Sequence, residues 1–233
     1  MGIRSKKDNA RLAGLIYLVV VLTGIFSLGY VPSQLIVWDD AATTYNNILA
    51  SEFLFRLGIV SGILCYLSFL VLPFILYELF KPVNRIYAVL MVVLAVVSVP
   101  ISLFNMINKV DILTLISGAQ YLNTFEAEQL HTQVMLLLKS YNNGILVVEV
   151  FWGLWLFPFG YLAFKSGYLP RIFGILLMLG CFSYLVRFSG SMFFPNFDMP
   201  SFVGLPASLA EIGTCLWLLI MGVKDKPATN IKR

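Results

Sequence analysis

Charged residues are scarce in this chain of 233 residues. Only 12% of the residues are charged and 59% are hydrophobic, and the mean hydropathy is +0.87. A soluble domain carries about 25% charged residues, so this deficit excludes an ordinary soluble protein and indicates a surface that mostly meets lipid. The net charge of +4 comes from residues at the ends of apolar stretches, so we expect membrane lipids as neighbours and no nucleic acid as a partner.

Histidine and cysteine are scarce as well. The single histidine, His131, excludes a bis-histidine haem and argues against a histidine-based metal site. Cys65, Cys181 and Cys215 lie in apolar stretches and none belongs to a C-x-x-C pair, so we expect neither a disulfide framework nor a metal cluster. The chain also lacks the G-x-S-x-G, H-E-x-x-H and phosphate-loop motifs. We therefore expect no cofactor and no metal.

Six stretches are long and apolar enough to cross a bilayer as helices, since a span needs about 20 mostly apolar residues. They predict an all-α class: a polytopic transmembrane bundle of six helices in one membrane domain, followed by a tail at 224–233. The first stretch exceeds the core of a signal peptide, about 7–15 residues, so we expect it to stay uncleaved. A short interfacial helix is expected over 126–139. The predicted spans are 12–31, 53–80, 86–108, 144–164, 172–193 and 205–223.

The basic residues divide unequally between the two sides of the predicted bundle. Lys and Arg accumulate on the cytoplasmic side of membrane proteins. One side holds Lys109 and Lys139. The other holds Arg4, Lys6, Lys7, Arg11, Lys81, Arg85, Lys165, Arg171, Lys224, Lys226, Lys232 and Arg233. We therefore expect both the N-terminus and the C-terminus to be cytoplasmic.

Two short turns on the predicted cytoplasmic side resemble each other. In each, a Pro-Phe pair near the end of a span is followed by Lys, a short turn and Arg-Ile: Pro73 to Ile86, and Pro158 to Ile172. The similarity favours a duplicated helical hairpin, as found in transporters. The alternative is chance likeness between apolar helices, and parallel repeats alone do not imply transport.

Three charges lie inside stretches that are otherwise apolar: Glu149, Arg187 and Glu211. At 1.5 Å per residue they lie ~24, ~24 and ~20 Å from the basic residues at the cytoplasmic ends of their spans. A hydrocarbon core is about 30 Å thick, so all three are expected in one layer in its outer part. Charges at such depth usually face a bundle interior or a cavity, and a Glu–Arg–Glu cluster is possible because Arg binds carboxylates in a bidentate fashion.

Further polar residues lie near this layer in the predicted arrangement. Asn105 faces it from the third span, and Arg56 with Glu52 could cap it or reach the outer surface. One interpretation is an outward-facing polar pocket for a small polar molecule, an ion or a lipid headgroup. The other is an internal ion pair that only orders the bundle. Two acids facing one Arg leave one carboxylate without a counter-charge, which Arg56, a proton or a ligand must neutralise, and this imbalance favours the pocket.

Three stretches resemble a family of bacterial multi-pass membrane proteins known as domain of unknown function 4386. They are Arg11-Leu-Ala-Gly-Leu-Ile-Tyr-Leu18, Phe157-Pro-Phe-Gly-Tyr-Leu-Ala-Phe-Lys-Ser-Gly-Tyr-Leu-Pro-Arg171 and Leu205-Pro-Ala-Ser-Leu-Ala-Glu-Ile-Gly213. The resemblance spans nearly the whole chain. It implies a protein of the bacterial cytoplasmic membrane with six spans, and it implies no activity.

The leading functional hypothesis is non-enzymatic. An outward-facing polar pocket centred on Glu149, Arg187 and Glu211 would bind, sense or pass a small solute or ion. The alternative is an enzyme that modifies a lipid, with Glu149 or Glu211 as acid or base and His131 assisting. A third hypothesis is a structural or partner-binding protein whose intramembrane charges serve packing alone.

Overall fold

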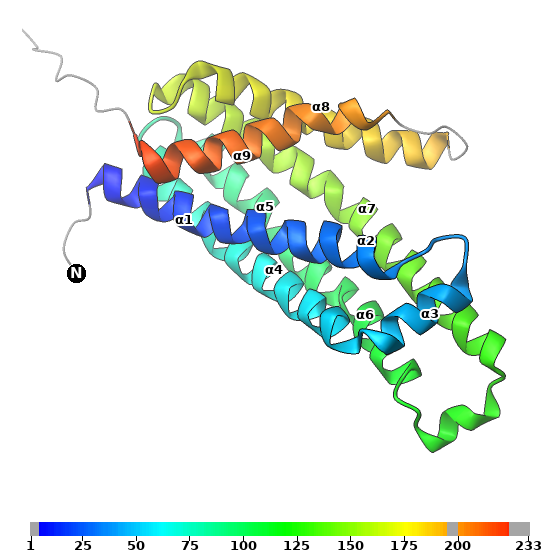
Figure 1. Ribbon diagram of the computed structural model, residues 1–233. Coiled ribbons are helices and arrows are strands. Elements are labelled where there is room, and N and C mark those ends of the chain that lie inside the picture. The colour runs from blue at the N-terminus through cyan, green and yellow to red at the C-terminus, as the bar shows by residue number, and fades with distance from the viewer. Residues whose placement is uncertain (1–4, 195–199, 224–233) are drawn as a thin grey trace, which may run out of the picture. The chain divides into compact units, whose positions relative to one another are not determined.

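The structure is a computed structural model that describes residues 5–194 and 200–223. Over these ranges the chain forms helices joined by turns, without a strand (Figure 1). The all-α class and the six candidate spans are confirmed. The predicted tail at 224–233 lies outside the described residues, as does Arg4. The helical stretches long and apolar enough to cross a membrane are Lys6–Leu35, Glu52–Phe80, Arg85–Leu115, Ala127–Ser166, Arg171–Phe193 and Phe202–Ile220.

The first of these stretches changes its helical type along its length. It consists of α1 (Lys6–Gly24), a π-helical segment (Ile25–Tyr30) and α2 (Val31–Leu35). Pro32 is the second residue after the π-helical segment, in the first turn of α2. A proline inside a helix removes one hydrogen bond and crowds the carbonyl four residues before it. The wider π turn relieves that crowding and lets the helix continue.

The remaining elements follow in chain order. The third candidate span is interrupted for one residue at Met106, between α5 and α6, and the sixth begins with a turn of 3₁₀-helix. Their bounds are α3 (Ala41–Ala50), α4 (Glu52–Phe80), α5 (Arg85–Asn105), α6 (Ile107–Leu115), a 3₁₀ turn (Gln120–Thr124), α7 (Ala127–Ser166), α8 (Arg171–Phe193), a 3₁₀ turn (Ser201–Gly204) and α9 (Leu205–Ile220).

The helices divide into two compact units by their internal packing. The first unit comprises Met1–Val19, Ser68–Ser98 and Glu149–Arg233, and the second comprises Val20–Leu67 and Val99–Val148. Each unit has its own buried core and is described separately.

An aromatic cluster forms the core of the first unit. The fully buried Trp155 of α7 stacks on Phe159 at 5.2 Å between ring centroids, and Phe69 and Tyr17 meet it edge-on at 5.1 and 6.4 Å. Edge-on and offset arrangements are the favoured geometries of aromatic pairs. The cluster therefore ties α1, α4 and α7 together at one level.

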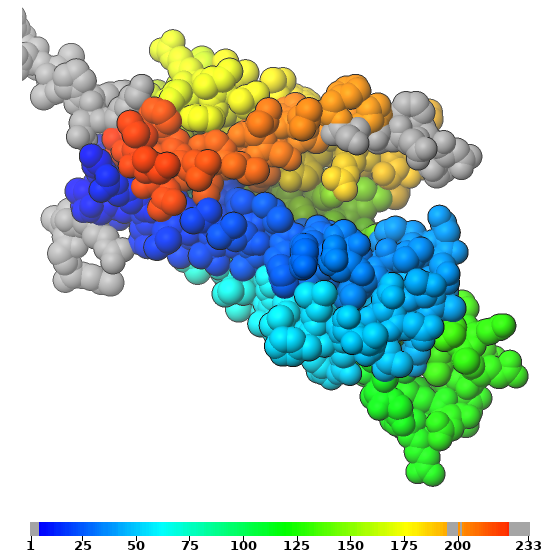
Figure 2. Space-filling view, viewed as in Figure 1, coloured from blue at the N-terminus to red at the C-terminus, as the bar shows by residue number. Residues whose placement is uncertain are grey.

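Small residues let the helices of the first unit approach one another closely. A Cβ built on Gly160 of α7 would lie 2.6 Å from the carbonyl oxygen of Gly174 in α8. Likewise, a Cβ on Gly14 of α1 would overlap the backbone of Leu219 in α9. Figure 2 shows α9 lying along the N-terminal part of α1. Such contacts are typical of helix pairs in membranes.

The second unit contains α3, a short helix outside the candidate spans. Asp40 caps its N-terminus and accepts hydrogen bonds from the backbone N–H of Thr43 at 2.8 Å and from its hydroxyl at 2.7 Å. These bonds favour the charged carboxylate, so they lower the pKa of Asp40 from its ordinary value. Thr44 then ties α3 to the preceding chain through bonds to both backbone groups of Val37.

Large apolar side chains cover the outside of the helices. Phe53, Ile86, Phe104 and Phe193 are each at least 75% exposed. Soluble proteins rarely expose apolar patches of this extent. This surface is suited to lipid, in agreement with the six apolar helices.

The predicted short helix over 126–139 does not exist as a separate element. These residues begin α7, which runs without a break from Ala127 to Ser166. The prediction was wrong because the polar residues before 144 were taken as the end of one helix, whereas α7 continues through them. Val134, Leu138 and Tyr141 keep a buried stripe at helical spacing across the polar region.

Candidate functional site

Arg187 and Glu149 form an ion pair in the first unit. Arg187 Nη2 of α8 lies 3.0 Å from Glu149 Oε1 of α7. A close helix contact brings them together, because a Cβ on Gly153, one turn beyond Glu149, would lie 2.7 Å from Tyr184 Cβ. The pair is asymmetric in exposure: the side chain of Glu149 is 5% exposed and that of Arg187 is 54% exposed.

The second carboxylate oxygen of Glu149 is unsatisfied. Glu149 Oε2 is buried and accepts no hydrogen bond from the described residues. A buried polar atom without a partner is rare and costs about 1–3 kcal/mol. Arg187 uses one of its nitrogens on Glu149, and its guanidinium has five N–H donors. The pair therefore offers one acceptor and several donors side by side.

Glu211 of α9 bonds to two tyrosines. Tyr17 of α1 donates its hydroxyl to Oε1 and Tyr184 of α8 donates to Oε2, both at 3.3 Å. The register of α1 against α9 explains the first contact, because Cys215 Sγ donates to the carbonyl oxygen of Gly14 one turn along the pair. Both distances are long for O–H···O bonds, which are usually 2.5–3.0 Å.

Within the described residues no ion pair joins Arg187 to Glu211. This differs from the Glu–Arg–Glu cluster suggested by the sequence. The reason lies in α8, where Tyr184 and Arg187 are three residues apart and share one face. From that face Tyr184 reaches Glu211 and Arg187 reaches Glu149.

Arg56, Glu52 and Asn105 belong to the second unit and form their contacts there. Arg56 Nε lies 2.6 Å from Glu52 Oε1 one turn away in α4, with both side chains well exposed. Asn105 Nδ2 donates to the carbonyl oxygen of Tyr141 at 2.8 Å. A Cβ on Gly144 would overlap the Asn105 side chain, so glycine there makes room for this bond.

His131, the helper in the enzymatic alternative, lies in the second unit. Its ring packs against that of Tyr45 with 4.7 Å between centroids. In the parts of the chain that the structure describes, no three His, Cys, Asp or Glu side chains are grouped as metal ligands.

Lys109 was not predicted as a site residue. It follows the predicted span 86–108 and was counted on the side opposite the cytoplasm, yet Lys109 is only 3% exposed within the second unit. Its ammonium lies 4.1 Å from the centroid of the Tyr141 ring and donates to the carbonyl oxygen of Ser27 at 3.4 Å. Ser27 lies in the π-helical segment, a type of turn that is frequent at functional sites. The spacing of Asn105 and Lys109, one helical turn apart, was the signal available in the sequence.

The chain resembles one curated relative over part of its length. An uncharacterized protein of Archaeoglobus fulgidus is 34% identical over 79 residues, which is 32% of this chain and 44% of the relative. The match thus spans less than half of that protein. No solved structure matches the chain significantly. The model of the family described as "Domain of unknown function (DUF4386)" matches residues 12–222. The chain therefore belongs to the DUF4386 family, as its sequence motifs predicted.

Proposed function

We propose that the protein binds a small polar solute at the Glu149–Arg187 pair, in a site that faces outward from a bacterial cytoplasmic membrane. The observation that carries the proposal is the buried Glu149 Oε2, which accepts no hydrogen bond from the described residues although it lies beside a guanidinium. A solute with an N–H donor and a polar acceptor would satisfy Glu149 and engage Arg187 together.

The charges in the first unit favour a solute that carries a positive group. Arg187 pairs with Glu149, and among the described residues the hydrogen bonds of the Glu211 carboxylate come from the hydroxyls of Tyr17 and Tyr184. An uncompensated buried carboxylate is costly. An ammonium group bound here would supply both the missing charge and the missing donor.

The outward direction of the site rests on the basic residues. Lys and Arg concentrate at the turns Lys81–Arg85 and Lys165–Arg171 and near both ends of the chain. The positive-inside rule places these segments in the cytoplasm. Glu149 and Arg187 then lie toward the opposite face, at ~24 Å along their helices.

Ethanolamine and choline provide a matched pair of probes. Both carry one positive charge and one hydroxyl, but only ethanolamine has ammonium N–H donors. We expect ethanolamine to raise the unfolding temperature of the purified protein in detergent by about 5–10 °C at a hundredfold excess over its Kd. Choline is expected to give little shift, because it has no N–H donor for Glu149 Oε2. Thermal unfolding followed by tryptophan fluorescence measures both.

Variants of the pair separate binding from packing. Glu149→Gln should abolish the ethanolamine shift while the protein still folds, and Glu128→Gln, an exposed change on the same helix, should retain it. A purely structural pair gives another result. Arg187→Gln would then lower the unfolding temperature without any ligand, and the double variant with Glu149→Gln would restore it. That result, with no shift from ethanolamine in the wild type, would refute the proposal.

A further inference from the structure

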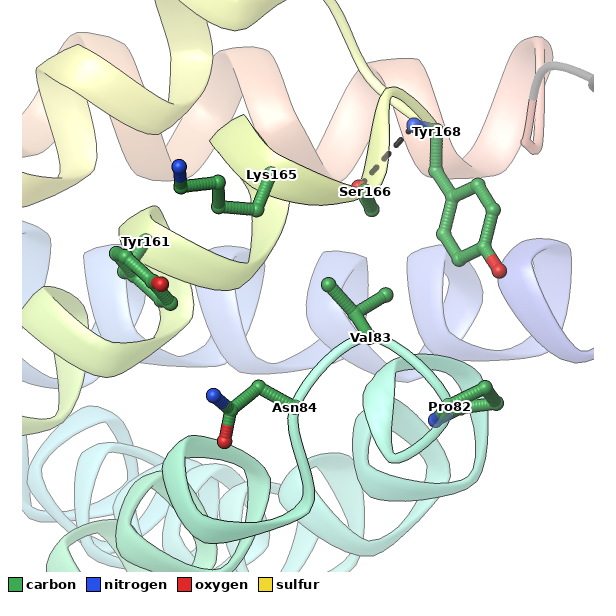
Figure 3. A pocket seen from close by; sticks show the side chains of 7 residues that line it. All are labelled: Pro82, Val83, Asn84, Tyr161, Lys165, Ser166 and Tyr168. Atoms are coloured by element: carbon green, nitrogen blue, oxygen red, sulfur yellow. Dashed lines mark hydrogen bonds between the residues drawn. The ribbon is translucent and has the colours of Figure 1, made fainter.

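A pocket lies between two turns of the first unit, at the ends of the helices. It has a volume of about 450 Å³ and is lined by Pro82, Val83, Asn84, Tyr161, Lys165, Ser166 and Tyr168. These residues come from the turn between α4 and α5, and from the end of α7 with the turn into α8 (Figure 3). They belong to the two hairpin turns whose sequences resemble each other.

Local hydrogen bonds fix the walls of the pocket. The buried Ser166 donates to the carbonyl oxygen of Ala163 at 2.9 Å and accepts from the backbone N–H of Tyr168 at 3.1 Å. Gly167 between them adopts φ +67°, a conformation that L side chains rarely adopt. On the other turn, Asn84 Oδ1 accepts from the backbone N–H of Tyr87 and caps α5. The pocket is therefore preformed.

Both turns contribute hydrogen-bond donors to the pocket. Figure 3 shows the Lys165 ammonium, the Tyr161 hydroxyl and the Asn84 amide on one side, with Pro82 and Tyr168 on the other. Since Asn84 Oδ1 is occupied by the cap, its Nδ2 donor remains for a ligand. The ring of Tyr161 stacks on the ring of Tyr87, with 4.2 Å between the ring centroids, and this contact holds Tyr161 in place.

The charge around the pocket is positive. In the described part of the chain, no Asp or Glu lines it. Lys6 approaches from α1, with its ammonium 3.4 Å from the Tyr168 hydroxyl and 5.6 Å from the ring centroid. The nearby Glu78 is already paired with Lys81 at 2.6 Å and does not line the pocket. An anion with several acceptor oxygens fits these donors.

We propose that this pocket binds the phosphate-bearing headgroup of an anionic phospholipid. Lys165, Tyr161 and Asn84 would hold the phosphate, because together they supply a cation and neutral donors from both turns. The Pro82 and Tyr168 end, which Lys6 approaches, would receive the glycerol part of the headgroup. The pocket is far larger than a phosphate ion and within the range of about 300–1,000 Å³ typical of ligand sites. Its place at the helix ends is the level at which basic pockets meet lipid headgroups.

Native mass spectrometry of the purified protein with phosphatidylglycerol tests the site. We expect one tightly bound phosphatidylglycerol and at least about tenfold weaker binding of the zwitterionic phosphatidylcholine. Lys165→Gln should weaken phosphatidylglycerol binding about tenfold or more, since a hydrogen bond to a charged group is lost. Tyr161→Phe keeps the stack on Tyr87 and removes one hydroxyl without changing the charge. It should weaken phosphatidylglycerol binding about threefold to tenfold.

Lys81→Gln is the matched control, because it removes the same charge from an exposed lysine outside the pocket. Lys81→Gln should leave the affinity for phosphatidylglycerol within about twofold of the wild-type value. If Lys81→Gln and Lys165→Gln weaken phosphatidylglycerol binding equally, the proposal is overturned in favour of diffuse electrostatic attraction to the surface. Glycerol 1-phosphate binding as tightly as the lipid would overturn the lipid as the source of the phosphate. Lys165→Gln should also leave the ethanolamine shift intact, so this proposal and the proposed function fail separately.

Discussion

At the scale of single residues, the cost of a buried charge depends on the groups that surround it. Lys109 and Glu149 are both buried, but their surroundings differ. Lys109 lies over the face of Tyr141 and donates to the carbonyl oxygen of Ser27. Glu149 has one oxygen paired and one unpaired. Lys109 therefore has local compensation, whereas Glu149 leaves an acceptor for a ligand.

The contact between Lys109 and Tyr141 can be measured with a double-mutant cycle. Combining Lys109→Met with Tyr141→Leu should reveal a coupling free energy of about 1–2 kcal/mol, the range for a desolvated cation over an aromatic ring. Equilibrium unfolding in mixed micelles provides the four free energies. The same cycle with Tyr141→Phe, which keeps a ring but loses the hydroxyl contact with Tyr66, should retain most of the coupling. A coupling within about 0.5 kcal/mol of zero for the leucine cycle would contradict this account.

Depth along a helix can be read from the sequence, but the direction of a side chain cannot be read as reliably. Counting residues from the basic ends of the helices predicted that Glu149 and Arg187 lie at the same depth in the membrane. In the structure, Arg187 Nη2 lies 3.0 Å from Glu149 Oε1. The partners of Glu211 were not predicted. Tyr17 is far away in the sequence, and no local pattern shows that α1 packs against α9.

At the scale of elements, close packing of helices depends on glycines at a few positions. Gly14 of α1 lies against the backbone of α9, where a Cβ would be 2.6 Å from Leu219 Cα. A backbone cannot move aside as a flexible side chain can. The α1–α9 contact in the first unit thus requires glycine at this position.

We expect Gly14→Ala to destabilise the protein by about 1–3 kcal/mol, because an added methyl group forces the helices apart. Thermal and denaturant unfolding in detergent measure the change. Gly29→Ala is the control, since a Cβ on Gly29 would meet nothing within 4 Å. Its effect should be small or stabilising. Similar losses from both changes would show that the effect does not come from the α1–α9 contact.

The ends of the helices were harder to predict than their existence. Hydropathy reports where a helix can meet lipid, which is a different property from where its hydrogen bonds stop. For α7 the predicted span began at 144, whereas the helix begins at Ala127. In α4, by contrast, the apolar stretch and the helix agree closely, at 53–80 and Glu52–Phe80.

At the scale of the whole molecule, the orientation in the membrane remains a prediction from the basic residues. It can be tested with single cysteines in a variant that lacks the buried Cys65, Cys181 and Cys215. We expect Ser117→Cys, in the exposed segment after α6, to react with a membrane-impermeant maleimide in intact cells. Ser5→Cys, before α1, should react only after the cells are opened. Labelling of Ser5→Cys in intact cells would reverse the orientation and with it the outward direction of the Glu149 site.

The six spans could be predicted because lipid imposes a simple requirement. Every span needs a long apolar helix with its backbone bonds satisfied internally. The packing of the helices cannot be predicted in the same way, because the surfaces that meet lipid and those that meet other helices are both apolar. Phe53 at 75% exposure and Phe80 at full burial belong to one helix and have the same chemistry. Some polar residues and glycines, such as Asn105 and Gly14, lie on inner faces, but others, such as Gly29, do not.

The aromatic core around Trp155 has a spectroscopic consequence. The chain has four tryptophans. Trp152, Trp155 and Trp217 belong to the first unit, and Trp38 belongs to the second, where it is 40% exposed. Replacing Trp38 by Phe would leave an emission spectrum that originates from the first unit alone. Intrinsic fluorescence would then report the environment of the unit that contains Glu149 and Arg187, without an attached dye.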